Sequence, residues 1–263
     1  MKLLLENWRK YLNEATQTEI YKFTKELHRL IFDEFKNNAI PIFNNGRRRH
    51  QFIAKERNEP IKNNILNPYN IDIIIANFEW TKATDYEAFL NSTKGAPWLG
   101  GASWDPKPTG LEFIINYTFV VPDENFDFNQ YLEKFNQDLF EKIAHELTHA
   151  KQYKEKGRTG KEPPRDILGD PAGIEEYYLD PREKEAFIRG MYFKARRTKT
   201  NLQDSITSFF TAVFYSAIQI MKEDFESGHL QQAAAVKKRE ELLQIIGLIT
   251  KEYQAEAKSM YGV

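Results

Sequence analysis

The sequence contains no cysteine, although the chain is 263 residues long. A small secreted domain held together by disulfides is therefore excluded, and no thiolate is present to bind a metal ion. Any metal site in this chain must be built from histidine and carboxylate side chains. Histidine is itself scarce, with five residues in the chain, so a pair of histidines at regular spacing is informative.

An excess of charge of either sign is also missing, because 37 Lys and Arg residues are balanced by 38 Asp and Glu residues. This balance gives no electrostatic reason to expect nucleic acid or an anionic membrane as a partner. No apolar run approaches the roughly 20 residues of a membrane span. The opening residues MKLLLENWRK hold too short an apolar stretch for a signal peptide. We therefore expect a cytoplasmic protein with neither a nucleic-acid nor a membrane partner.

The residue pattern predicts an α+β fold. β-Branched residues over 71–79 predict a buried strand, and the segments 98–104 and 111–120 flank a turn-rich stretch and predict a β-hairpin. Segments with helical periodicity make up most of the rest. They cover 1–14, 18–38, 84–91, 128–156, 181–198, 202–223 and 229–258.

Two segments without clear periodicity are expected to be irregular. The basic cluster Arg47–His50 is typical of a solvated loop or a helix start. Residues 157–180 are rich in glycine and proline, which predicts a long loop of the kind that borders functional sites. The predicted organisation is an amphipathic helix over 1–14, an α+β core over 15–180 and a helical subdomain over 181–263.

The sequence His145-Glu146-Leu147-Thr148-His149 is an HExxH motif within a predicted helix. Histidines four positions apart lie on one helix face, so both imidazoles can reach the same ion. Glu146 lies on the flank, where it can contact a water without becoming a ligand. This pattern predicts a hydrolase with one Zn²⁺ per chain, in which Glu146 is the general base for peptide-bond hydrolysis.

Zinc in a catalytic site needs a third protein ligand. Gln152 and Glu155 stand where the longer HExxHxxGxxH pattern has glycine and histidine, so this ligand must come from elsewhere. The segment that begins at Asp180-Pro181 looks like a helix start, with Asp180 as the N-cap. Glu183 within it is our first candidate and Glu185 the alternative, although Glu183 also fits a capping box with Asp180. Further candidates are Glu175, Glu176, Asp180 and His229.

The HExxH motif together with Glu183 and Ala186 resembles the gluzincins, the zinc peptidases that add a Glu-x-x-Ala helix. HELTHAKQY followed by YYLDPREKEAF is similar to uncharacterised HExxH proteins encoded by T4-like phages. The resemblance covers about 98–190. It implies a zincin-like core, a small mixed sheet packed on the HExxH helix, and a helical subdomain that supplies Glu183 as the third ligand.

Substrate contacts follow from the same reasoning. Tyr177, Tyr178 and His229 are candidate donors to an oxyanion, although tyrosines more often serve packing. Gluzincin-like sheets hold extended peptides along an edge strand, and our candidate is 98–104. Its residues Gly100, Gly101 and Ala102 leave room for a second backbone.

A second hypothesis belongs to another class: a virion or host-directed structural protein of a phage, with a degenerate or structural metal site. The N-terminus MKLLLENWRKYLNEA resembles the leaders of proteins packaged into the heads of T4-like phages, where cleavage follows Leu/Ile-x-Glu. Leu12-Asn13-Glu14 fits that pattern, and Leu4-Leu5-Glu6 also fits it. This resemblance implies capsid association through the leader and packaging of the protein from the host cytoplasm into the virion.

Overall fold

The computed structural model describes residues 19–55, 71–93, 95–107, 110–122, 126–156, 170–228 and 230–262. The chain divides into two compact units, Met1–Glu155 and Lys156–Val263. The predicted helix over 1–14 lies outside the described residues. Within the described part of the chain, no helix is both long enough and apolar enough to cross a membrane.

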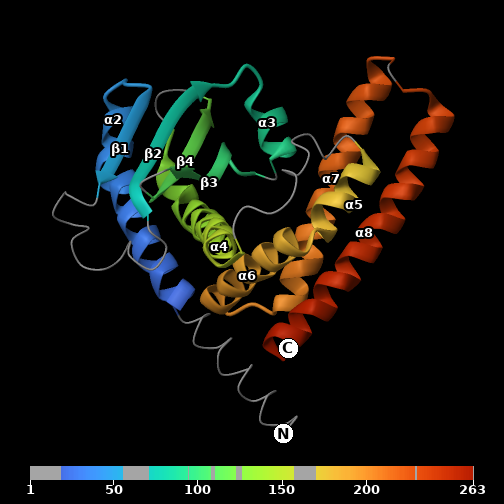
Figure 1. The fold of residues 1–263 in the computed structure, drawn as a ribbon. Coiled ribbons are helices and arrows are strands. Elements are labelled where there is room, and N and C mark those ends of the chain that lie inside the picture. The colour runs from blue at the N-terminus through green and yellow to red at the C-terminus, as the bar shows by residue number, and fades with distance from the viewer. Residues whose placement is uncertain are drawn as a thin grey trace, which may run out of the picture. The chain divides into compact units, whose positions relative to one another are not determined.

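The first unit is built on a four-stranded mixed sheet (Figure 1). Its strands β1 (Arg49–Lys55), β2 (Ile71–Lys82), β3 (Trp98–Lys107) and β4 (Gly110–Val121) lie in the order β1-β2-β4-β3. β2 and β4 are parallel, while β1–β2 and β3–β4 are antiparallel. The predicted α+β class, the small mixed sheet and the hairpin are confirmed, and β3 lies at an edge.

The helices of this unit precede and follow the strands. Residues 19–34 are helical and continue through a π-helical turn at Phe35–Ala39 into α2 (Ile40–Asn44). The short helix α3 (Tyr86–Ser92) leads towards β3, and a 3₁₀ turn at Phe128–Tyr131 leads into α4 (Leu132–Lys156). The HExxH motif therefore lies on α4, which follows the sheet along the chain.

An aromatic core joins these helices to the sheet. The Phe35 ring contacts the rings of Phe78 on β2 and Phe119 on β4, with centroid distances of 5.1 and 4.9 Å. It also contacts Phe135 on α4 at 4.5 Å. The helix over 19–34, with its π-helical turn, and α4 therefore pack on the same face of the sheet. Burial of these rings holds the helices on the sheet.

The expectation of a loop or helix start at the basic cluster is wrong for Arg49 and His50, which begin β1. Both side chains have acidic neighbours, because Arg49 Nε lies 3.1 Å from Glu79 on β2 and His50 Nε2 lies 2.7 Å from Glu34 in the preceding helix. The Arg49–Glu79 pair lies across β1 and β2, and such cross-strand charge pairs stabilise a strand whose own sequence looks solvated.

The second unit is entirely helical among its described residues. It contains α5 (Pro171–Leu179), α6 (Pro181–Thr198), α7 (Leu202–Glu226) and α8 (Gln232–Tyr261), and α7 and α8 run side by side (Figure 1). Its core is formed by side chains that are almost completely buried. They include Tyr178, Ile206, Phe210, Ile249 and Tyr253.

Helix α5 corrects the prediction of a loop through residue 180. Asp170 caps it by accepting a hydrogen bond from the Gly173 N–H at 3.1 Å, and Pro171 occupies its first turn. The helix has nine residues, and its buried positions after Pro171 are Ile174 and Tyr178. Two apolar residues four positions apart are too few to establish a helical period in the sequence. The remainder of the predicted loop, 157–169, lies outside the described residues.

Candidate metal centre

A polar network holds α4 on the sheet through residues that precede the HExxH motif in the helix. Asp138 Oδ2 accepts hydrogen bonds from the Tyr117 hydroxyl at 2.9 Å and from Trp98 Nε1 at 3.2 Å. Lys142 pairs with Asp138 at 3.2 Å and donates to the Gly100 carbonyl. Burial, and then the Asp138 carboxylate, raise the pKa of the buried Tyr117, so this residue stays a hydrogen-bond donor. The helix is thereby joined to both β3 and β4.

The two faces of α4 differ in burial. Leu139, Ile143 and Leu147 are fully buried against the core. The side chains of His145 and Glu146 are 12% and 19% exposed. The helix therefore presents His145 and Glu146 on its less buried side, as expected for an amphipathic helix.

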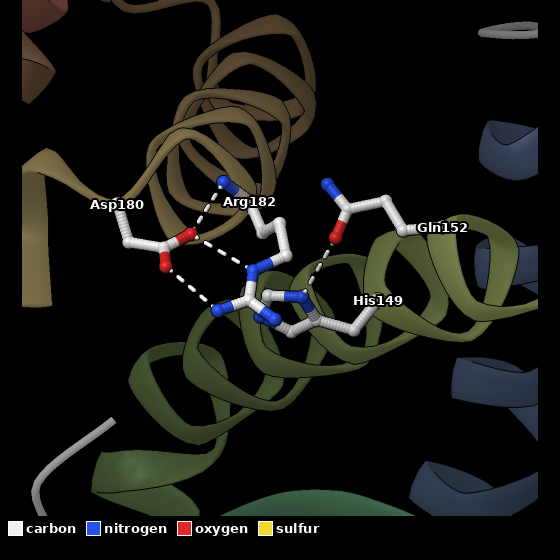
Figure 2. A network of polar contacts seen from close by, with 4 residues as sticks. All are labelled: His149, Gln152, Asp180 and Arg182. Atoms are coloured by element: carbon white, nitrogen blue, oxygen red, sulfur yellow. Dashed lines mark hydrogen bonds and ion pairs between the residues drawn. The ribbon is translucent and has the colours of Figure 1, made fainter. Parts of the chain in front are cut away.

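The two histidines point their Nε2 atoms at one another, 3.1 Å apart. Two nitrogens that bind one tetrahedral zinc ion at about 2.0–2.1 Å lie about 3.3 Å apart. The observed separation is therefore close to the one that a shared ion requires. His149 Nδ1 lies 3.0 Å from Gln152 Oε1, one turn further along α4 (Figure 2). The sequence alone leaves the role of Gln152 open, because a glutamine that supports His149 and a solvated glutamine fit the same spacing.

Glu146 lies beside the two nitrogens. Its Oε1 is 3.9 Å from His145 Nε2. The Glu146 carboxylate is thus near the Nε2 atoms of the two histidines, and its position on the helix places it to one side of them. A carboxylate in this place can accept a proton from a water at the site.

Glu183, on α6, completes a group that could hold a metal ion. Ligand atoms of His145, His149 and Glu183 all lie within 4.8 Å of one another. Two imidazole nitrogens and one carboxylate oxygen match the donor chemistry that zinc accepts in proteins without cysteine ligands. Glu183 is 9% exposed, and a buried carboxylate of this kind normally has a cation or hydrogen-bond donors as neighbours.

The start of α6 bears on the capping-box interpretation of Glu183. Asp180 caps the helix by accepting from the Arg182 N–H at 2.8 Å, and Pro181 occupies the first turn, as predicted. In a capping box, the Glu183 carboxylate would accept from the Asp180 N–H. That N–H instead donates to the Tyr177 carbonyl at 3.3 Å. The helix start is therefore satisfied without the Glu183 side chain.

The Arg182 side chain belongs to the same cap. Its Nε and Nη2 atoms donate to the two carboxylate oxygens of Asp180 at 3.0 and 2.7 Å (Figure 2). These hydrogen bonds lower the pKa of Asp180 and keep it ionised. Asp180 is thus engaged as a cap, which accounts for its charge without a role as a metal ligand.

The other candidate ligands in the described part of the chain are not members of the group. Glu185 Oε1 pairs with Arg189 Nη2 at 2.7 Å, and the Arg189 side chain is 5% exposed. Neither Glu175 nor Glu176 belongs to the group among the described residues. His229 lies outside the described residues, both as a ligand and as an oxyanion donor.

The two tyrosine candidates lie in the helical core. The Tyr178 ring is 5.2 Å from Phe187 and 5.3 Å from Phe210, and Tyr177 contacts both Tyr178 and Phe187. Burial, followed by the nearby Glu183 carboxylate, raises the pKa of Tyr178. Packing accounts for both rings, and a role in oxyanion binding stays a prediction.

The edge-strand glycines have a structural reason of their own. Gly100 has a φ of +139°, and a Cβ there would lie 2.1 Å from the Asn116 carbonyl oxygen on β4. Gly100 therefore permits close pairing between β3 and β4. A Cβ on Gly101 would be 3.7 Å from the Lys142 side chain, which is an ordinary contact. Peptide binding along Gly100, Gly101 and Ala102 stays a prediction.

Comparison with known proteins adds no relative to this description. No protein-family model, no curated protein and no solved structure matches the chain. The resemblance to gluzincins and to phage HExxH proteins therefore stays a prediction, and the chemistry of the site has to be argued from its own residues.

Proposed function

We propose that the protein is a zinc-dependent metallopeptidase, with His145, His149 and Glu183 as zinc ligands. The observation that carries the proposal is the approach of these three ligand atoms to within 4.8 Å of one another. Three protein ligands leave one coordination position open, which is typical of catalytic zinc sites, whereas structural sites are closed by four. A metal site of purely structural purpose is less compatible with this donor set.

The residues around the ligands have separate tasks in this proposal. When bound, zinc supplies a Lewis acid that polarises a carbonyl and acidifies a water. Glu146, beside His145, accepts the proton of the attacking water and passes it to the leaving amine. Peptide bonds are the proposed substrate because the HExxH spacing with its glutamate serves that reaction in metallopeptidases.

The virion or host-directed alternative depends on the first 14 residues, which lie outside the described part of the chain. The same is true of capsid association through the leader and of packaging from the host cytoplasm. These ideas are compatible with a peptidase, since a packaged protein can be an enzyme. A degenerate site and an active one are distinguished by metal content and hydrolysis.

The test is zinc content and proteolysis measured on the same purified chain. We expect about one zinc per chain and cleavage of a fluorescently labelled unfolded protein. A chelator should abolish cleavage, and added Zn²⁺ should restore it. The double variant His145→Ala/His149→Ala should lose both properties. Zinc binding that is unchanged in the double variant would overturn the site, and zinc binding without any hydrolysis would favour the structural alternative.

A further inference from the structure

Gln152 is a polar side chain of α4 that contacts a motif histidine and has no part in the HExxH pattern. Gln152 is 8% exposed, and its Oε1 lies 3.0 Å from His149 Nδ1. It stands at the position where the longer HExxHxxGxxH pattern has glycine, which has no side chain to reach back. This contact lies within one turn of a single helix (Figure 2).

The contact determines where His149 carries its proton. The amide oxygen of glutamine has no hydrogen, so a hydrogen bond at this distance requires a proton on Nδ1. A neutral imidazole has one N–H, so Nε2 of His149 is then unprotonated and carries a lone pair. That is the form of histidine that binds a metal ion through Nε2.

The direction of that lone pair also fits. His149 Nε2 lies 3.1 Å from His145 Nε2, on the side of the helix where Glu146 also lies. A bond from Nδ1 to a buried acceptor fixes the rotation of the ring as well as its tautomer. The Nε2 atom of His149 is therefore directed at the same point as the Nε2 atom of His145.

We propose that Gln152 is a positioning residue that locks His149 in the Nδ1–H tautomer, with its Nε2 lone pair aimed at the metal. The inference deepens the proposed function and rests on it for its purpose. The tautomer itself is a property of the protein without metal. Gln152 touches neither metal nor substrate and acts through His149.

The experiment compares Gln152→Leu, Gln152→Glu and the matched control Gln137→Leu. Leucine removes the acceptor at similar volume, while glutamate keeps an oxygen that can accept from Nδ1. Gln137 lies on the same helix, where its amide contacts Glu133 at an exposed position 3.3 Å away. Two quantities are measured: the ring ¹⁵N chemical shifts of His149 in metal-free protein, and zinc affinity by chelator competition.

We expect His149 to be protonated at Nδ1 in the wild type, in Gln152→Glu and in Gln137→Leu, and to become a mixture of tautomers in Gln152→Leu. Zinc affinity should fall about 10–100-fold in Gln152→Leu and stay near the wild-type value in the other two. A wild-type His149 with its proton on Nε2, or an unchanged tautomer in Gln152→Leu, would refute the inference.

The two readouts separate this inference from the proposed function. If the wild-type chain binds no zinc, the metallopeptidase proposal fails, and the tautomer measurement still decides the role of Gln152. If zinc binds and Gln152→Leu changes neither tautomer nor affinity, the inference fails while the metal site stands.

Discussion

Individual side chains around the HExxH motif differ in the tasks that their surroundings allow. His145 and His149 face one another through Nε2 atoms, and Glu146 lies to the side of this pair. Glu183 is buried at the start of α6, whereas Glu185, two positions later, is paired with Arg189. Identical residue types close together in sequence thus have different roles, and single substitutions can separate them.

Replacement of Glu146 by Gln tests the general base. The amide keeps the shape of the side chain but cannot take a proton from water. We expect the rate of peptide cleavage to fall by several orders of magnitude, while zinc content stays at the wild-type level. Zinc content and turnover are measured on the same sample. Loss of zinc in Glu146→Gln would instead make Glu146 a ligand and contradict the assignment.

The pair Glu183→Ala and Glu185→Ala tests the third ligand. Removal of Glu183 takes away a metal donor, so zinc affinity should fall by more than about 100-fold, beyond the loss expected for a residue that only supports a ligand. Glu185→Ala breaks an ion pair with the buried Arg189 and should lower thermal stability while zinc affinity is retained.

The opposite result for Glu183 is equally specific. A residue that only closes the start of α6 would cost about 1 kcal/mol of folding stability on replacement and leave zinc affinity intact. Calorimetric unfolding of the metal-free variants, measured beside chelator competition, distinguishes the two outcomes.

Helices and strands were predictable from sequence where caps and periodicity agreed. α6 begins and ends at the predicted residues, because Asp180 and Pro181 mark its start and its apolar stripe is long enough to read. β1 and α5 were missed, since charge at Arg49 and His50 hides a paired strand and α5 is short. The HExxH spacing indicated the two histidines, but the contact between Gln152 and His149 depends on side-chain rotamers that no sequence pattern specifies.

At the edge strand, Gly100 and Gly101 form a matched pair of test sites. Gly100→Ala places a Cβ 2.1 Å from the Asn116 carbonyl at a positive φ, so we expect a loss of about 2–4 kcal/mol in unfolding free energy. Gly101→Ala meets an ordinary contact and should cost within about 0.5 kcal/mol. Urea unfolding of both variants checks this, and equal effects would contradict the close approach of β3 to β4.

The molecule as a whole has two cores, an aromatic one beneath the mixed sheet and a helical one around Tyr178, Phe210 and Tyr253. Each unit buries its own apolar side chains. A ligand can therefore change the free energy of local opening in one unit without changing it equally in the other. Hydrogen exchange resolved along the chain reports such responses separately.

A peptide inhibitor with a zinc-binding end tests where substrate lies. We expect it to add antiparallel to 98–104, because β3 is an edge strand of the sheet. Amide exchange should slow in 98–104 and in 157–180, while α7 and α8 change little. Mass spectrometry after pulse labelling provides the measurement, and protection confined to α7 and α8 would place the substrate elsewhere.

The corner between α5 and α6 has one further consequence, for insertions and deletions. Asp180 is both the residue that ends α5 and the residue that caps α6, so the two helices meet with no spare residue between them. One residue inserted in the first turn of α6, between Pro181 and Glu183, would turn Glu183 by about 100° around the axis of α6 relative to the cap, since each helical residue advances by that angle. Glu183 would be carried away from its present direction although both helices stayed intact. Chain length at this corner is therefore as strict a requirement of the site as the identity of its ligands.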